Sequence, residues 1–309
     1  MKIRTLFLAA TALTLAGCGG NGDEAKTQTT EAVSKVASEA KSQVMPKVDS
    51  AKLSAILAAQ SDEMKSRYDA RHPQETLEFF GIAPGMTIIE ALPGGGWYSK
   101  ILIPYLGDEG HLVGVDYSIE MWPEFGGFAT PEFVENKKTW ATEWVEGAQG
   151  WRGGAEGEIS AFTFGDRNTE MDGTVDAVLF VRALHNLARF EDEGGYLSEA
   201  MADTKALLKP GGLVGVVQHQ GPETNDDTWA EGDNGYMKKS QLIAKFEAAG
   251  FELVKESDIN ENPKDVPSNE DIVWRLPQSL ATSRDNPELK AQMEAIGESN
   301  RMTLLFKKV

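Results

Sequence analysis

Short apolar segments that favour β-strands alternate with segments of helical spacing over most of the chain after residue 84. The first strand-like segments are GMTIIEAL (85–92), GHLVGVDYS (110–118), EISAFTF (158–164) and VDAVLFVRAL (175–184). Helical spacing follows in GWYSKILIPYL (96–106), YLSEAMADTKALL (196–208) and KSQLIAKFEAAG (239–250). Strands separated by helices form mostly parallel sheets with right-handed crossovers. The sequence therefore predicts an α/β fold with a mostly parallel sheet.

The remaining segments complete this alternation and leave two long intervals. Strand-like LVGVVQHQ (213–220), FELVKESDI (251–259) and RMTLLFKKV (301–309) follow, while one helix is predicted over 50–70 and another from Pro73. Residues 118–157 and 259–300 lack a clear pattern, and loops of that length tend to be lids or substrate-binding inserts. Four tryptophans in the first interval favour a packed aromatic subcore over a ligand cage: Trp122, Trp140, Trp144 and Trp151.

The first residues have the pattern of an export signal. Lys2 and Arg4 precede an apolar run that is too short for a transmembrane helix, and the run ends in LAGC at Cys18. This ending resembles the lipobox of bacterial lipoproteins, which implies acylation of Cys18 and membrane anchoring. An uncleaved anchor or a simple secretory signal is the alternative. By the same resemblance, Gly19 after the cysteine favours the periplasmic side of the outer membrane over the inner membrane.

The predicted domain organisation follows from this signal and from composition. We expect a lipoprotein signal peptide at 1–17, a flexible tether at 18–50 and one folded domain at 51–309, because the tether has no aromatic residues and too few apolar ones to form a core. The 48 acidic and 30 basic residues give a formal charge of -18, which disfavours nucleic acid as a partner. Cys18 is the only cysteine, and no metal-ligand spacing stands out, so we expect no metal site. The oligomeric state is left open.

A glycine-rich turn stands between the first predicted strand and the helix after it. EALPGGGWYSK (90–100) places Gly94, Gly95 and Gly96 where a ligand's polar end can reach backbone N–H groups at a helix N-terminus. Asp116 ends the next strand 22 residues after Gly94, near the spacing of about 20 residues at which an acid binds ribose hydroxyls in dinucleotide folds. Both features indicate a nucleoside ligand, although a tight turn alone would also use glycine.

Further segments resemble one enzyme family from about residue 60 to the C-terminus. The turn LLKPGGLVGVV (207–217) and the strand RMTLLFKKV look like those of class I S-adenosylmethionine-dependent methyltransferases. RHPQETLEFFGIAPGMTIIEALPGGGWYSKILIPYLG (71–107), INENPKD (259–265) and IGESNRMTLLFKK (296–308) resemble a family of exported bacterial predicted methyltransferases. The resemblance implies a Rossmann-like class I methyltransferase fold, with a mostly parallel seven-stranded sheet whose last strand is antiparallel.

The resemblance also implies a cofactor site. Glu90 and the glycines at 94–96 would surround the methionine part of S-adenosylmethionine, Asp116 would hold the ribose, and Asp166 would meet the adenine amino group. The general methyltransferase pattern has glycine two residues after the acid, where this chain has Leu92. In the alternative interpretation, Glu90 pairs with a backbone amide and Asp166 caps a turn.

Candidate residues for chemistry follow the fourth and fifth predicted strands. Ligands of open α/β sheets bind beyond the C-terminal ends of the strands, where Arg182, His185, Asn186 and His219 fall. Methyl transfer from a sulfonium needs positioning and, for an alcohol or amine acceptor, a base. By the resemblance, Arg182 faces the crevice where substrate and methyl group meet. From their positions after the fourth and fifth strands, His185 or His219 is the candidate base. The alternatives are that the histidines only pack and that Asn186 is an N-cap.

Residues near both ends of the domain are candidates for substrate binding. Comparable enzymes fold an N-terminal segment over the pocket, which would bring Arg71 and His72 to the substrate side together with Asn260 and Asn262. Alternatively, His72 holds the start of the helix at Pro73.

The predicted function is that of an exported, lipid-anchored methyltransferase that uses S-adenosylmethionine and acts on a small molecule. The alternative is a non-catalytic binding or scaffold protein, since S-adenosylmethionine is charged and made in the cytoplasm. A nicotinamide-dependent oxidoreductase is a third possibility, which the final strand and LKPGG fit poorly.

Overall fold

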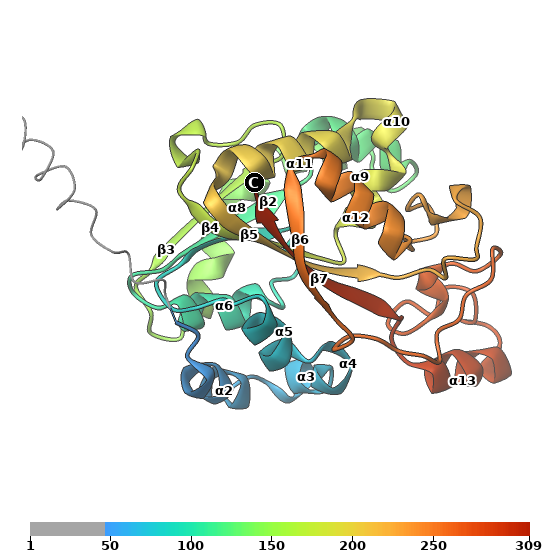
Figure 1. The fold of residues 1–309 in the computed structure, drawn as a ribbon. Helices are drawn as coiled ribbons and strands as arrows, with labels where there is room; N and C mark the ends of the chain where they lie inside the picture. Colours follow the sequence, from blue (N-terminus) through green and yellow to red (C-terminus); the bar gives the residue numbers. More distant parts are fainter. Residues whose placement is uncertain (1–46) are drawn as a thin grey trace, which may run out of the picture. The chain divides into compact units, whose positions relative to one another are not determined.

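Among residues 47–309, which the computed structural model describes, seven strands form one sheet in the order β3-β2-β1-β4-β5-β7-β6 (Figure 1). The strands are β1 (Thr87–Ala91), β2 (His111–Asp116), β3 (Glu158–Thr163), β4 (Val175–Val181), β5 (Leu208–His219), β6 (Phe251–Ser257) and β7 (Arg301–Lys308). Neighbours from β3 to β5 are parallel, whereas β7 is antiparallel to both β5 and β6. The predicted class I methyltransferase fold is therefore confirmed. The predicted signal peptide, Cys18 and most of the predicted tether lie outside the described residues.

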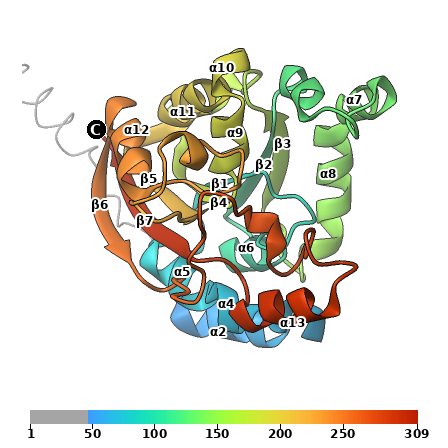
Figure 2. The same cartoon turned by 90° about the vertical axis from the view of Figure 1, so that its right-hand side faces the viewer.

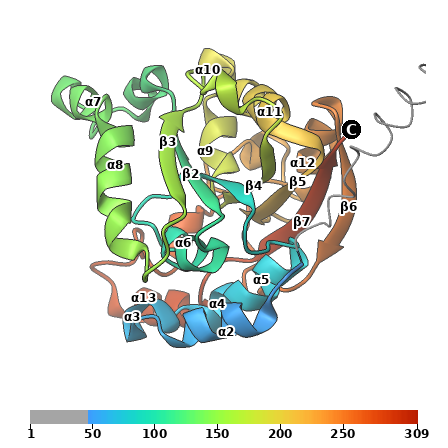
Figure 3. The same ribbon diagram turned by 90° about the vertical axis from the view of Figure 1, so that its left-hand side faces the viewer.

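Helices cover both faces of the sheet because successive strand side chains point to opposite sides. In β1, Ile88 belongs to one apolar cluster and Ile89 to the other. The cluster around Ile88 packs against α2 (Ser50–Ala58), α5 (Pro73–Phe79), α6 (Ser99–Leu106) and α8 (Trp140–Ala148). The cluster around Ile89 packs against α9 (Leu184–Arg189), α11 (Tyr196–Leu207) and α12 (Lys239–Ala248). Figures 2 and 3 show this three-layer arrangement from two sides. The described residues thus contain a complete core, and we expect them to fold without residues 1–46.

The helix predicted over 50–70 is wrong, because three helices occupy this region: α2, α3 (Asp62–Lys65) and α4 (Tyr68–Arg71). The Ser61 hydroxyl accepts a hydrogen bond from the Met64 N–H at 3.3 Å, which starts a new helix at α3. His72 ends α4 because its φ of 40° is left-handed, and Pro73 then begins α5 as predicted.

The interval 118–157 is mostly helical rather than a loop, and it contains η1 (Ile119–Phe125), α7 (Pro131–Lys137), α8 and η2 (Gln149–Trp151). Its tryptophans are packed, but in two groups rather than in one subcore, because Trp122 belongs to the cluster around Ile89 and the other three pack in the cluster around Ile88. The rings of Trp140 and Trp144 stack with centroids 5.9 Å apart, Trp144 meets Trp151 edge-on at 6.1 Å, and Trp122 meets Phe133 at 5.2 Å. This packing on both faces of the sheet holds the helices of the interval in place, although their sequence shows no clear helical pattern.

The interval 259–300 contains two short elements, η5 (Val273–Arg275) and α13 (Pro287–Ile296). The remaining short elements are α10 (Glu191–Gly194), η3 (Thr169–Met171) and η4 (Thr228–Ala230). None of the helices in the described part of the chain combines the length and the apolar character needed to cross a bilayer.

Candidate active site

A cleft of about 1080 Å³ lies beyond the carboxyl ends of β1, β4 and β5. Leu92 and Gly94 come from the turn after β1, Arg182 and His185 follow β4, and His219 ends β5. The strand order reverses between β1 and β4, and such a switch point is where open α/β sheets bind their ligands. The position of the cleft therefore follows from the topology of the sheet.

The three glycines of the turn differ in what surrounds them. Gly94, with a φ of 54°, and Gly95 have open space where a Cβ would stand, and both line the cleft. Gly96 has a φ of 73°, and a Cβ there would lie 2.4 Å from the indole of Trp151. The backbone at 94–95 is thus open to a ligand, whereas Gly96 makes room for Trp151.

Leu92 adopts a left-handed backbone at the edge of the cleft, with a φ of 55°. This conformation costs a non-glycine residue roughly 1–2 kcal/mol because its Cβ approaches the following carbonyl oxygen. Leu92 occupies the position where the general methyltransferase pattern has glycine. The backbone therefore has the conformation that glycine favours, while the side chain is that of leucine.

A comparison of two substitutions tests this strain at Leu92. Both Leu92→Gly and Leu92→Ala lose the buried part of the leucine side chain, but only glycine relieves the left-handed strain. We expect the glycine variant to be more stable than the alanine variant by about 1 kcal/mol, the reverse of the usual order in helices and strands. Urea denaturation of the two variants measures this difference, and an alanine variant at least as stable as the glycine variant would contradict it.

Asp116 forms an ion pair at the end of β2. Its carboxylate lies 2.9 Å from the ammonium of Lys137 on α7, which also stands 4.0 Å from the Trp122 ring centroid. Burial raises the pKa of Asp116, and Lys137 opposes this rise. Asp116 does not line the cleft, and Lys137 contacts one of its two carboxylate oxygens, so a nucleoside that uses this carboxylate competes with Lys137 for it.

Glu90 and Asp166 also lie outside the lining of the cleft. The Glu90 carboxyl is buried and accepts a hydrogen bond from the Ser99 hydroxyl at 2.6 Å, rather than from a backbone amide. Burial raises the pKa of Glu90 to about 8, while the Ser99 hydrogen bond acts in the opposite direction. Glu90 is therefore mostly protonated at pH 7. Asp166 is exposed in the turn after β3.

The two predicted histidines lie side by side, with ring centroids 5.3 Å apart. The Gln218 amide nitrogen donates to the Gly235 carbonyl at 3.2 Å, and the same nitrogen lies 3.3 Å from Nδ1 of His185. Since a carbonyl only accepts, this fixes the amide orientation and makes Nδ1 of His185 an acceptor, so its Nε2 carries the proton. Nδ1 of His219 lies 2.5 Å from the Ser299 hydroxyl.

Both histidines are neutral at pH 7. Burial lowers the pKa of His185 to about 4, and burial together with the neighbouring His185 and Arg182 lowers the pKa of His219 well below its ordinary value. His185 therefore presents an N–H donor. His219, whose Nδ1 pairs with the Ser299 hydroxyl, is the remaining candidate for accepting a proton, and its lowered pKa makes it a weak base.

The residues predicted to bind substrate separate into two groups. Arg71 and Asn186 line the cleft, and Asn186 donates to the Tyr117 hydroxyl at 2.7 Å instead of capping a helix. His72, Asn260 and Asn262 do not line it. His72 joins α4 to α5 through its backbone, as the alternative held.

The expectation that the two asparagines face the substrate is corrected, because both stabilise the chain around the cleft. Asn260 is buried and donates to the hydroxyls of Thr76 and Thr303, each at 3.0 Å. Asn262 donates to the carbonyls of Ile296 and Glu298.

Sequence reasoning missed several residues of the cleft and its surroundings. Trp97, Trp274, Ser299 and Glu298 line the cleft, and Arg301 pairs with Glu298 at 3.1 Å. Glu298, Ser299 and Arg301 lie within the segment 296–308 that carries the family resemblance, which was the only available signal. Within residues 47–309, no three acidic or histidine side chains gather as metal ligands.

Solved structures with a similar fold include S-adenosylmethionine-dependent methyltransferases and a cyclase. A SAM dependent methyltransferase from Aquifex aeolicus is 15% identical, with a TM-score of 0.45, and the match covers 85% of this chain and 100% of that one. A Burkholderia thailandensis 1,6-didemethyltoxoflavin-N1-methyltransferase with bound S-adenosylhomocysteine is 12% identical, with a TM-score of 0.41 over 96% and 93% of the two chains. The cyclase SpnF is 15% identical, with a TM-score of 0.45 over 77% and 80%. No family model and no curated protein matches the chain.

Proposed function

We propose that this protein is an S-adenosylmethionine-dependent methyltransferase that acts on a small molecule. The observation that carries the proposal is the cleft at the β1–β4 switch point, with the backbone of Gly94 and Gly95 open to it. The cleft is large enough for a nucleoside cofactor and a small acceptor. The open backbone at 94–95 suits the methionine end of the cofactor. The Asp116 carboxylate suits the ribose end if the ribose replaces Lys137 as its partner.

The chain's own residues have distinct roles in this proposal. Bound S-adenosylmethionine supplies an electrophilic methyl group. The backbone at 94–95 orients its methionine end, and Asp116 holds the ribose hydroxyls. His219 accepts the proton of an alcohol or amine acceptor, and His185 donates a hydrogen bond through Nε2. Arg182 positions the acceptor from the end of β4.

Calorimetric titration of the soluble form that begins after Cys18 tests this function. We expect S-adenosylmethionine and S-adenosylhomocysteine to bind with micromolar affinity, and Asp116→Ala to abolish binding in a protein that stays folded by circular dichroism. Lys137→Ala removes the competing ion pair and is expected to tighten binding severalfold at pH 8, since a partly buried pair of this kind is worth about 1 kcal/mol.

Two results of this titration would overturn the proposal. The first is the absence of binding at millimolar ligand in the wild-type protein and in the Lys137→Ala variant. The second is wild-type affinity in the Asp116→Ala variant, which would remove the assigned ribose site.

A binding protein without turnover is the second candidate function. It is favoured by the Asp116–Lys137 pair, which occupies the carboxylate that a nucleoside would use, and by the leucine side chain at position 92. Cofactor binding without methylated product in a broad acceptor screen would favour this candidate.

We further propose that the protein belongs to the exported methyltransferase family that its sequence resembles. In this proposal, the signal peptide at 1–17 is removed, acylated Cys18 anchors the chain to the periplasmic side of the outer membrane, and residues 18–50 tether the domain at 51–309. Labelled palmitate fed to bacteria that express the full chain is expected to appear in the protein and to be absent after Cys18→Ser. Equal labelling of both would contradict the anchor.

A further inference from the structure

The lining of the cleft contains more basic than acidic side chains: Arg67, Arg71, Lys100 and Arg182 against Glu63 and Glu298. Arg71 and Arg301 share one carboxylate, that of Glu298, at 3.3 Å and 3.1 Å. Arg182 lies close enough to interact electrostatically with Arg71, Arg301 and Glu298, but it forms no ion pair within residues 47–309. The other acid of the lining, Glu63, is exposed at the rim. Three guanidinium groups thus lie near one carboxylate, and only two of them pair with it.

Arg182 has unused hydrogen-bonding capacity in this setting. Its Nε is buried and has no hydrogen-bond partner among the described residues. Arg182 follows β4 directly and lines the cleft. Its backbone is left-handed, with a φ of 58°, a conformation that is strained for a residue with a side chain. Burial and the nearby Arg71 and Arg301 lower the pKa of Arg182 to about 10, as expected for a cation that lacks an anion.

Arg71 offers a second unused donor on the same side. One of its terminal nitrogens (Nη2) is buried without a partner in residues 47–309, although its Nε contacts Glu298. Its guanidinium lies 4.9 Å from the ring centroid of Trp97. Buried charged donors without partners are costly, and a planar guanidinium fork matches the oxygens of a carboxylate or phosphate.

The topology assigns Arg182 to the acceptor rather than to the cofactor, whereas Arg71, from α4, reaches the cleft beside Trp97, directly after the glycine turn. The open glycines follow β1 and Asp116 ends β2, so the proposed cofactor site lies on the β1–β2 side of the switch point. Arg182 follows β4, and His219 ends β5 on the other side. Trp97 and Trp274 supply apolar walls to the same cleft.

We propose that the acceptor of this cleft is a small molecule with an apolar body and an anionic oxygen group, a carboxylate or phosphate, that binds Arg182 and Arg71. That the bound molecule is a methyl acceptor rests on the proposed methyltransferase function, whereas anion binding itself is testable without any cofactor.

The test uses simple probes and the tryptophans of the cleft. Benzoate and phenyl phosphate are titrated into the soluble form while tryptophan fluorescence is followed, and benzamide serves as the neutral isostere of benzoate. We expect both anions to bind at least tenfold more tightly than benzamide, and high salt to weaken their binding. Whichever anion binds more tightly identifies the oxyanion that the site prefers.

Variants of Arg182 locate the anion. Arg182→Met is expected to weaken anion binding at least tenfold, and Arg182→Lys, which keeps the charge but loses the fork, to give an intermediate value. Arg284→Met removes one exposed arginine outside the cleft and is expected to leave anion binding unchanged, which controls for net charge. Affinity for S-adenosylhomocysteine should stay within about twofold of the wild-type value in all three variants.

Three outcomes would overturn the proposal. The first is benzamide binding as tightly as benzoate and phenyl phosphate. The second is Arg182→Met weakening anion binding no more than Arg284→Met. The third is Arg182→Met losing S-adenosylhomocysteine in proportion to the anions, which would make Arg182 a ligand of the cofactor carboxylate. If wild-type protein binds the anions but not S-adenosylhomocysteine, the anion site stands and the methyltransferase function fails.

Discussion

Replacing Glu90 with glutamine is expected to make the protein more stable at pH 8 by up to roughly 4 kcal/mol, with little change at pH 4.5. The pKa of the buried carboxyl is raised from its ordinary value of 4.5 to about 8. A raised folded pKa contributes stability that is fully present below pH 4.5 and is lost as the pH rises through 8. Glutamine keeps the shape and can still accept the Ser99 hydroxyl, but it never ionises.

Urea denaturation between pH 4.5 and pH 8.5 measures this effect. The difference in free energy of unfolding between Glu90→Gln and the wild-type protein should grow with pH and level off above pH 8. Glu109→Gln, at an exposed position after α6, is the matched control and should follow the wild-type profile. Parallel profiles for Glu90→Gln and the wild-type protein would show that this carboxyl titrates normally.

The same carboxyl also reports on the proposed cofactor. If a cationic cofactor lies near Glu90, it favours the ionised carboxylate, so binding at pH 7 releases up to one proton. Calorimetry in two buffers with different ionisation enthalpies measures this release, which should disappear in Glu90→Gln. Equal proton release from both proteins would place the cofactor's positive charge away from Glu90.

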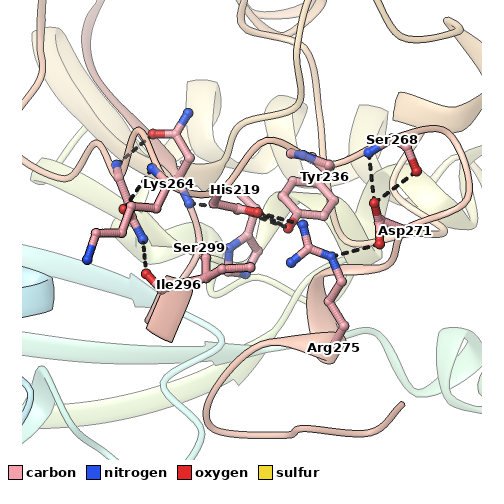
Figure 4. A network of polar contacts seen from close by, with 12 residues as sticks. His219, Tyr236, Lys264, Ser268, Asp271, Arg275, Ile296 and Ser299 are labelled. Atoms are coloured by element: carbon pink, nitrogen blue, oxygen red, sulfur yellow. Dashed lines mark hydrogen bonds and ion pairs between the residues drawn. The ribbon is translucent and has the colours of Figure 1, made fainter. Parts of the chain in front are cut away.

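Removing the Asp265 carboxylate is expected to cost about 3–5 kcal/mol of stability. Its side chain is fully buried and receives hydrogen bonds from Arg275 at 2.8 Å, the Tyr236 hydroxyl at 3.0 Å and the backbone N–H of Asn300 at 2.8 Å. Asp265→Ala therefore leaves a buried guanidinium with an incomplete set of partners. Figure 4 shows Arg275 near Tyr236 and Asp271, with His219 and Ser299 close to this network.

Asp271→Ala is the matched control, because it removes the other acid that pairs with Arg275, at 3.0 Å, from a half-exposed position. We expect this variant to lose about 1 kcal/mol or less. Denaturation curves compare the two variants, and similar losses would mean that burial of Asp265 is not what makes its ion pair strong. Asp265→Ala also removes the acceptor of the Asn300 N–H. We expect this to loosen the neighbouring Ser299 and to weaken ligand binding in the cleft.

Several features of the site were predictable because they depend on the sheet alone. Parallel strands end at one edge, so residues that follow β4 and β5 had to come together there. This places Arg182, His185, Asn186 and His219 around one cleft, as the positions after the predicted strands indicated. The glycines after β1 reach the same cleft for the same reason.

Other features were not predictable because they join segments that are distant in the sequence. Lys137 reaches Asp116 only because the interval 118–157 folds into helices beside β2. Trp151, from the end of the same interval, packs on Gly96 and gives that glycine a role other than cofactor binding. No local pattern indicates which of three consecutive glycines a tryptophan will cover.

The sequence by itself therefore determined the α/β class, the seven strands in their order along the chain, and the edge of the sheet where ligands bind, since these follow from periodicity and strand direction. Only the tertiary structure decided the charges and protonation of the site. Burial raises the pKa of Glu90 and lowers that of His219, and the shared carboxylate of Glu298 leaves Arg182 without an anion. These properties depend on distances between side chains and on exclusion of water, which a linear sequence does not contain.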